Sequence, residues 1–203
     1  MAVKHASTAT TTKGWLVAVA ILVLVATAVT PSSAALPITT NETPFYLYAQ
    51  GVGQWVRTHT AYGADPMRAA DGISKGQATR YIIDSWDPNA HGPEVNGIVA
   101  LPTEAWAFNL LAPDMPHRYC APSNATGSWG QGTLLCLYDS RPTPWLRLSS
   151  ADGQSAMRVG GSVYLQDVAT GRYCTAPSWP TNQAGLICDS SRATVYQQFM
   201  INV

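Results

Sequence analysis

A duplicated cysteine motif constrains the fold of this chain more than any other feature. The tripeptide Arg-Tyr-Cys occurs at residues 118–120 and again at 172–174, and a Pro-Ser pair begins within three residues of each. A second cysteine follows after 16 residues in the first copy and after 14 in the second, each time behind two aliphatic residues. Four cysteines allow three pairings, and spacing alone does not choose among them. The duplication favours one local disulfide in each copy, Cys120 with Cys136 and Cys174 with Cys188.

A third copy of the unit lies upstream and has no cysteines. When Asp71 is placed on Asp189, an offset of 118 residues, the two segments align without a gap. The alignment superposes residues of the same kind: Tyr46-Leu47 on Tyr164-Leu165, Gly53 on Gly171, Trp55 on Tyr173, Tyr81 on Phe199 and Ile83 on Ile201. Val56 and Ala70 fall on the two cysteines of the last copy. The first copy therefore keeps the apolar framework and lacks the disulfide.

Short strands separated by turns are the regular elements that the pattern indicates after residue 35. Alternating or apolar runs at 45–48, 81–83, 145–148, 163–165 and 199–203 are typical of strands, and segments rich in Gly, Pro, Asn and Asp separate them. The expected fold is all-β, a β-trefoil with a six-stranded barrel, a hairpin cap and repeats at about 44–98, 99–152 and 153–203. The aromatic residues expected in its core are Trp55, Tyr81, Tyr119, Trp145, Tyr173 and Phe199.

The first 34 residues have the order of a secretory signal peptide. Two lysines and no acidic residue precede an apolar run at 16–29, and small residues follow it. This run of 14 residues is shorter than the roughly 20 that a membrane span needs. We expect cleavage after Ala34 or Ala35, which leaves one secreted domain at 35–203 without stable membrane insertion. An uncleaved anchor is the alternative, and it would also leave that domain outside the cytosol.

Further features agree with export. Asn41 and Asn124 each begin an N-x-Thr triplet, the acceptor of N-glycosylation. The even number of cysteines fits disulfides in an oxidising compartment. We therefore expect an extracellular glycoprotein with two disulfides.

Charge and motif content narrow the function. Charged residues make up 12% of the chain, 12 basic and 12 acidic, so neither a basic nucleic-acid surface nor an acidic tail is indicated. No closely spaced Cys/His set predicts a metal site, and no nucleophile, zinc-protease or phosphate-loop motif is present. We expect a protein that is not an enzyme and needs neither a cofactor nor a metal.

The repeats resemble the ricin-type lectin branch of the β-trefoils over roughly residues 44–203. That family carries a local disulfide inside a repeat and a closing Gln-x-Trp, which Gln197-x-Phe199 and Thr143-x-Trp145 resemble here. The resemblance implies carbohydrate binding. The family's sugar site uses an Asp shortly after the first cysteine and an aromatic residue just before the second. This chain has Ala-Pro and Thr-Ala after its first cysteines, and Leu-Leu and Leu-Ile before its second ones, so that site is not present in the sequence.

Each copy has an aromatic residue between its two cysteine positions, or between the residues aligned with them in the first copy. This residue offers another surface on which a ligand could bind. Tyr62, Trp129 and Trp179 stand beside Gly, Ser or Pro, as at exposed loop tips, and a sugar ring could pack on them. The polar residues expected to assist are Asn182 and Gln183, with Asn124 and Gln131 as further candidates. The alternative is that these rings fold back over the barrel ends as packing.

A second function remains open on the sequence alone. β-Trefoils also act as protease inhibitors or receptor ligands through one protruding loop. The long segment at 84–104 is the candidate for such a loop and for a protein partner. The sequence thus predicts a secreted binding module, with a glycan or glycoprotein as the leading partner and a protein as the alternative.

Overall fold

The fold is described from a computed structural model of the 203-residue chain. The structure describes residues 35–39, 43–58, 66–70, 72–87, 92–93, 97–101, 107–111, 119–124, 130–138, 146–177 and 185–203. Residues Ala34–Val203 form one compact unit.

Strands provide nearly all the regular structure of the described residues, and the alternating runs of the sequence are confirmed as strands. The strands are β1 (Tyr46–Ala49), β2 (Gln54–Thr58), β3 (Met67–Ala70), β4 (Ile82–Asp87), β5 (Gly92–Pro93), β6 (Ala107–Leu111), β7 (Tyr119–Pro122), β8 (Leu134–Tyr138), β9 (Leu146–Ser150), β10 (Ser162–Asp167), β11 (Tyr173–Thr175), β12 (Ile187–Ser190) and β13 (Gln198–Asn202). Two short 3-10 helices accompany them in the described part of the chain, η1 (Lys75–Gln77) and η2 (Val195–Gln197).

A closed barrel forms the centre of the fold. The strands β1, β13, β10, β9, β6 and β4 are hydrogen-bonded to one another in that order. The circle closes because Phe45, just before β1, and Tyr81, just before β4, exchange backbone hydrogen bonds of 2.9 and 2.7 Å. Closure removes the free edges that an open sheet would expose.

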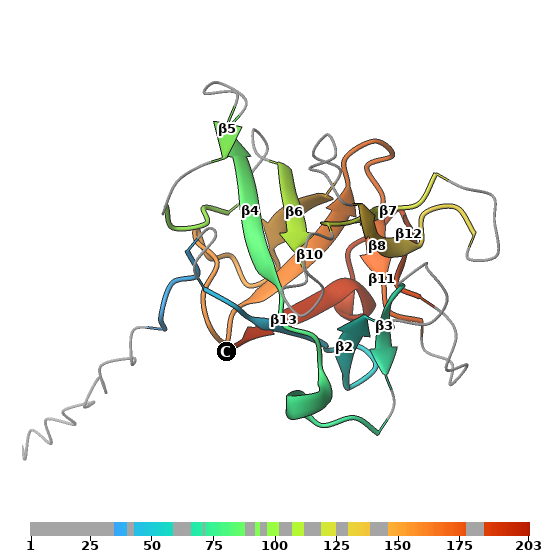
Figure 1. The fold of residues 1–203 in the computed structure, drawn as a ribbon, viewed down its shortest axis with the longest axis horizontal. Coiled ribbons are helices and arrows are strands. Elements are labelled where there is room, and N and C mark those ends of the chain that lie inside the picture. The colour runs from blue at the N-terminus through green and yellow to red at the C-terminus, as the bar shows by residue number, and fades with distance from the viewer. Residues whose placement is uncertain are drawn as a thin grey trace, which may run out of the picture. The chain divides into compact units, whose positions relative to one another are not determined.

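The hairpins β2–β3, β7–β8 and β11–β12 gather on one side of the barrel strands (Figure 1). Backbone bonds join them: Leu134 N donates to Leu186 O at 2.8 Å, and Leu186 N donates to Met67 O at 2.6 Å. These three side chains, one from each hairpin region, are fully buried. The hairpins therefore pack as a cap around a common apolar centre.

A second set of bonds joins the segments that precede the first barrel strand of each repeat. Ile38 N donates to Met157 O, Met157 N to Val99 O, and Val99 N to Ile38 O, at 2.8 to 3.0 Å. The three side chains are buried, so a closed cycle of backbone bonds surrounds an apolar plug. The predicted first repeat at about 44–98 leaves out Ile38, whose segment corresponds to those of Val99 and Met157.

The first and last repeats, as aligned in the sequence, share a turn with the same backbone conformation and the same hydrogen bond. Gly53 and Gly171 have φ angles of +69° and +67°, a left-handed conformation that favours glycine. Gly53 N donates to Ala49 O and Gly171 N donates to Asp167 O, at 2.9 and 2.8 Å. Each of these residue pairs is separated by the same offset of 118. The predicted all-β fold, a β-trefoil with three related units, is confirmed.

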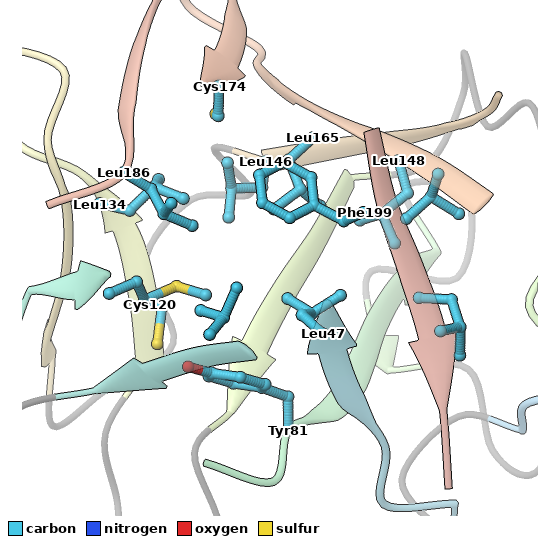
Figure 2. Close-up of a cluster of buried hydrophobic side chains, with 14 of the residues drawn as sticks. Leu47, Tyr81, Cys120, Leu134, Leu146, Leu148, Leu165, Cys174, Leu186 and Phe199 are labelled. Atoms are coloured by element: carbon cyan, nitrogen blue, oxygen red, sulfur yellow. The ribbon is translucent and has the colours of Figure 1, made fainter. Parts of the chain in front are cut away.

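The core lies inside the barrel and beneath the cap. Tyr81 and Phe199, the predicted equivalents, are both fully buried, and Figure 2 shows Phe199 among Leu146, Leu148 and Leu165. Trp55, Tyr119 and Tyr173 are only half-buried, so their assignment to the core is wrong. Each of them directly precedes a buried residue, Val56, Cys120 or Cys174, and side chains alternate between faces along a strand. Trp145 lies outside the described residues.

The predicted disulfide pairing is confirmed. Cys120 is bonded to Cys136 and Cys174 to Cys188, each across one cap hairpin. In both hairpins the register shifts next to the first cysteine, as at a β-bulge. The first hairpin has no such shift, and Val56 therefore pairs with Ala69, not with Ala70 as the gapless alignment predicted.

Candidate functional site

Most of the side chains predicted to bind a ligand lie outside the described residues. This holds for Tyr62, Trp129, Trp179, Asn182 and Gln183, and also for the first glycosylation candidate, Asn41. The structure does describe Asn124 and Gln131, and both are exposed. Asn124 lies two residues after the end of β7, so the second glycosylation candidate stands on the surface beside the β7–β8 hairpin.

The positions of the ricin-type sugar site are occupied by core residues. Pro122 and Ala176, two residues after the first cysteines, are buried, and Ala176 packs in the hydrophobic core. Leu134 and Leu186, two residues before the second cysteines, are fully buried where the cap hairpins meet (Figure 2). These side chains leave no polar group or exposed ring for a sugar at those places.

An aromatic cluster lies on the outer face of the first repeat. Tyr46, Tyr48 and Trp55 are half-buried and alternate with the buried residues of β1 and β2. The Trp55 ring meets the rings of Tyr48 and Tyr46 edge-on, with centroids 5.0 and 6.4 Å apart. Edge-to-face contacts hold aromatic rings in fixed orientations. The sequence signal for this cluster was present, because Val56 aligns with a disulfide cysteine and only one of two consecutive strand residues can face the core.

Positive charge accompanies the aromatic cluster. Arg57 on β2 lies directly opposite Arg68 on β3, and the Lys75 ammonium group lies 5.3 Å from the centre of the Tyr46 ring. Lys75 also donates to the carbonyl oxygen of Val203. Burial, followed by the charge of Arg57, lowers the pKa of Arg68 from its ordinary value. We call these residues, Tyr46, Tyr48, Trp55, Arg57, Arg68 and Lys75, the first-repeat face.

The first-repeat face can bind by contact and charge. Its aromatic rings offer apolar surface, and its cations attract anions. Among the described residues, no group of three or more His, Cys, Asp or Glu side chains is placed to hold a metal ion. Within the same residues, no helix has the length and apolarity needed to cross a membrane.

The predicted interaction loop at 84–104 is in part a structural segment. Residues 84–87 belong to β4, which pairs with β6 inside the barrel, and β5 pairs back onto β4. Val99 and Leu101 are buried, and Val99 is a member of the apolar plug. Both ends of the 84–104 segment thus belong to the folded framework. Fewer residues than predicted are therefore left for an interaction loop.

Solved structures similar to this chain include β-trefoils. The SDF2-like protein from Arabidopsis thaliana matches with a TM-score of 0.60 and 12% identity, over 82% of this chain and 94% of that one. ThreeFoil, a designed protein of threefold symmetry, matches with 0.50 and 15%, over 79% and 98%. A salivary protein from a Culex mosquito, of the cysteine and tryptophan-rich family, matches with 0.53 and 10%, over 83% and 96%. At these identities the likeness concerns the fold alone.

The fold thus places the chain in the β-trefoil class. The chain belongs to the family described as a domain of unknown function (DUF5888), whose model matches residues 12–201. No curated protein matches the sequence significantly.

Proposed function

We propose that this protein is a secreted, non-catalytic binding module whose ligand is a carbohydrate. The observation that carries the proposal is the aromatic cluster of the first-repeat face. Three large rings lie half-buried side by side on β1 and β2, outside the hydrophobic core. A sugar presents a face of C–H groups that can pack on such rings, while its hydroxyl groups bind polar neighbours.

The framework supports this role. The strands of the face are held in a fixed arrangement, because β1 is part of the barrel and Met67 O on β3 accepts a backbone hydrogen bond from Leu186 N. This lowers the entropy lost when a ligand binds. Tyr46 pairs with Asn202 on β13, so an amide group stands on the same face beside the rings. Amide groups can both donate and accept hydrogen bonds and therefore suit sugar hydroxyls.

We propose that the protein is secreted and acts outside the cell. The two disulfides are typical of proteins from oxidising compartments. Ile38, which closely follows the predicted cleavage site after Ala34 or Ala35, is part of the apolar plug. Cleavage there would release the whole folded unit. Glycosylation at Asn41 and Asn124 belongs to the same proposal.

The aromatic loop residues extend the proposal beyond the first-repeat face. Tyr62, Trp129 and Trp179 are proposed as further sugar platforms, with Asn182 and Gln183 as polar partners. One ligand site in each repeat would fit the threefold construction of the fold.

The test is a glycan array. The complete coding sequence is expressed in a secretory eukaryotic host, the protein is purified from the medium, and its first residues are sequenced. We expect an N-terminus at residue 35 or 36 and binding to a defined set of glycans. A Trp129→Ala/Trp179→Ala variant and a Trp55→Ala variant, each checked for folding by circular dichroism, then show which platform is used.

The outcomes separate cleanly. Loss of glycan binding in a folded variant would support the proposal and locate the site. Folded wild-type protein that binds no glycan on a broad array would contradict carbohydrate binding, and a retained leader would contradict release by cleavage.

A further inference from the structure

The edge-on aromatic contact of the first-repeat face recurs in the third repeat. Tyr164 and Tyr173 lie 118 residues after Tyr46 and Trp55, their counterparts in the first repeat. The ring centroids are 6.4 Å apart in the first repeat and 5.6 Å apart in the third, and all four side chains are half-buried. In the second repeat the strand register puts Asn109 at the place of Tyr46. The aromatic pair is therefore shared by the first and third repeats and is not a feature that every repeat needs.

A single barrel strand, β13, separates the two aromatic pairs. Tyr46 projects from the outer face of β1, which pairs with one edge of β13, and Tyr164 projects from the outer face of β10, which pairs with the other edge. Neighbouring strands lie about 4.8 Å apart, so the pairs are separated by roughly 10 Å across the barrel wall. One sugar ring is too small to cover both pairs, whereas a chain of a few sugars is long enough.

Polar side chains connect the two aromatic pairs across β13. Gln198 of β13 donates from its Nε2 to the Tyr164 hydroxyl at 3.1 Å. Ser162 of β10 donates from its hydroxyl to the side chain of Gln50, which follows β1, at 3.3 Å, so this bond joins the two strands that flank β13. Met200 of β13 is half-buried and is the cross-strand partner of Ser162. We call the outward side chains of β1, β13 and β10, together with Trp55 and Tyr173, the wall strip.

The wall strip combines apolar rings with uncharged polar groups. The outward positions of its three strands hold Tyr, Asn, Gln, Met and Ser, and none of them is charged. Lys75, beside the Tyr46 ring, donates a hydrogen bond to the carbonyl oxygen of Val203, so this cation already has a partner. Amides and hydroxyls both donate and accept hydrogen bonds. A neutral sugar chain is complementary to such a surface, because each sugar has a face of C–H groups and a rim of hydroxyl groups.

We propose that the wall strip binds a neutral linear oligosaccharide along its length, with one end of the chain on Tyr48 and Trp55 and the other on Tyr164 and Tyr173. The middle sugars lie over β13, where the side chain of Gln198 offers an amide and that of Met200 an apolar contact. The barrel strands hold both ends in a fixed arrangement, so the second contact costs little additional entropy once the first has formed.

This inference rests on the proposed carbohydrate binding and adds the length and the charge of the ligand. A site limited to the first-repeat face would bind a short sugar as well as a long one. A site that extends to the third repeat gains affinity as the chain grows long enough to reach Tyr164 and Tyr173. The dependence of affinity on chain length therefore distinguishes the two.

The test measures binding against chain length. The secreted wild-type protein is applied to an array of linear neutral saccharides of one to eight sugars, built from glucose, mannose, galactose, xylose or N-acetylglucosamine, with heparin and hyaluronan oligosaccharides as acidic chains. The dissociation constants of the disaccharide and the hexasaccharide of the series that binds are then determined by calorimetry. We expect the hexasaccharide to bind at least about tenfold more tightly, as a second aromatic contact implies.

The decisive variant is Tyr164→Asn, which introduces the residue of the second repeat at this place. It should abolish the gain from disaccharide to hexasaccharide and leave disaccharide binding unchanged, whereas Trp55→Ala should weaken binding of both. Tyr173→Ala is a second variant with the same expected result, and it keeps the bond between Gln198 and Tyr164. The matched control is Tyr119→Ala, because Tyr119 is half-buried at the equivalent place of the second repeat and pairs with β6, outside the wall strip. Circular dichroism checks that each variant is folded.

The gain in affinity with chain length decides the inference. Its loss in Tyr164→Asn or Tyr173→Ala, with disaccharide binding kept, supports the wall strip as the site. An unchanged gain in both variants would overturn the inference, as would an equal loss in Tyr119→Ala. Wild-type protein that binds single sugars as tightly as hexasaccharides, or that binds acidic chains alone, would also overturn it and leave the proposed carbohydrate binding intact. Wild-type protein that binds no saccharide at all would contradict both.

Discussion

At the scale of single residues, the closing Gln-x-Phe motif is a structural device. Gln197 is buried, and its Oε1 accepts hydrogen bonds from the backbone and the hydroxyl of Thr194 at 2.8 and 2.6 Å. Its Nε2 donates to the hydroxyl of Thr175 on β11 at 2.8 Å. One side chain thus fixes η2 and ties it to a cap hairpin. The sequence identified this motif through its resemblance to a closing Gln-x-Trp, but the role of the glutamine follows only from its partners.

Replacement of Gln197 by Ala should therefore destabilise the fold strongly. The change removes three part-buried hydrogen bonds that the buried Gln197 side chain makes to Thr194 and Thr175, at a cost of about 2 to 3 kcal/mol in the free energy of unfolding. Gln198→Ala is the control, because Gln198 is half-buried and has one side-chain bond, to the Tyr164 hydroxyl at 3.1 Å. Urea unfolding of both variants checks the difference. Equal losses would show that the bonds of Gln197 contribute no more than an ordinary surface contact.

Asp152 should make stability depend on pH. Burial tends to raise the pKa of its carboxyl group, but hydrogen bonds from Ser162 N, Ser150 Oγ and Gln154 N outweigh burial and hold the pKa below its ordinary value of 3.8. A carboxyl group whose pKa is depressed by folding stabilises the folded state above its unfolded pKa, and this contribution disappears as the pH falls through the folded pKa.

Asp152→Ala should thus lower stability at pH 7 by about 1 kcal/mol or less, since the group is exposed and screened by solvent. The difference from the wild type should shrink when the pH falls below about 4. Urea unfolding at pH 7 and pH 2.5 measures it. A difference that stays constant over this range would mean that the ionised carboxylate is not what stabilises the turn.

At the scale of elements, the alternation of side chains between the two faces of a strand decided which core predictions were confirmed. Leu47, Ile83, Leu165 and Ile201 were aligned as equivalents, and all four are fully buried. The error concerned Trp55 and its counterparts, whose size and apolarity suggested the core. Residue type alone cannot decide which face of a strand a ring occupies, whereas the neighbouring cysteine positions could have done so. The pairing of Arg57 with Arg68 could not be predicted from the sequence. It depends on the register of the β2–β3 hairpin, and the gapless alignment placed the partner of Val56 one residue too far along the chain.

The disulfide-bonded hairpins should depend on their cross-links to a similar extent. The bridges close loops with sequence separations of 16 and 14 residues, each worth roughly 3 kcal/mol in the chain-entropy model. Cys120→Ala/Cys136→Ala and Cys174→Ala/Cys188→Ala should each lower the free energy of unfolding by about that amount. Chemical denaturation without reductant measures both. A negligible loss in either variant would mean that its hairpin, like β2–β3, is stable without a cross-link.

At the scale of the whole molecule, the threefold construction was predictable and its closure was not. Repeated motifs and the offset of 118 residues indicated three related units. The cycle of backbone bonds through Ile38, Val99 and Met157 could not be predicted, because it joins three segments with no shared motif. The first repeat needs a segment that lies before the region where the repeat signal begins. The segment that contains Ile38 therefore completes the closure of the three repeats.

The apolar plug gives the last prediction. Ile38 is fully buried although it lies only a few residues from the predicted cleavage site, and its backbone bonds reach both other repeats. Ile38→Ala removes a buried side chain from a junction of three repeats and should lower the free energy of unfolding by about 2 to 4 kcal/mol. Leu36→Ala is the matched control, because Leu36 is 68% exposed, and it should change stability by less than about 0.5 kcal/mol.

Met157→Ala tests whether the plug acts as a unit. It should cost a similar amount to Ile38→Ala, and the double variant should cost less than the sum, because residues that share one cluster are coupled. Thermal and urea unfolding of the three variants decide the matter. If Ile38→Ala were as mild as Leu36→Ala, the barrel would close without its N-terminal segment, and the first repeat would begin at Phe45. A large loss would instead make the position of cleavage critical, because a signal peptidase cutting a few residues later would release a chain that lacks one third of its plug.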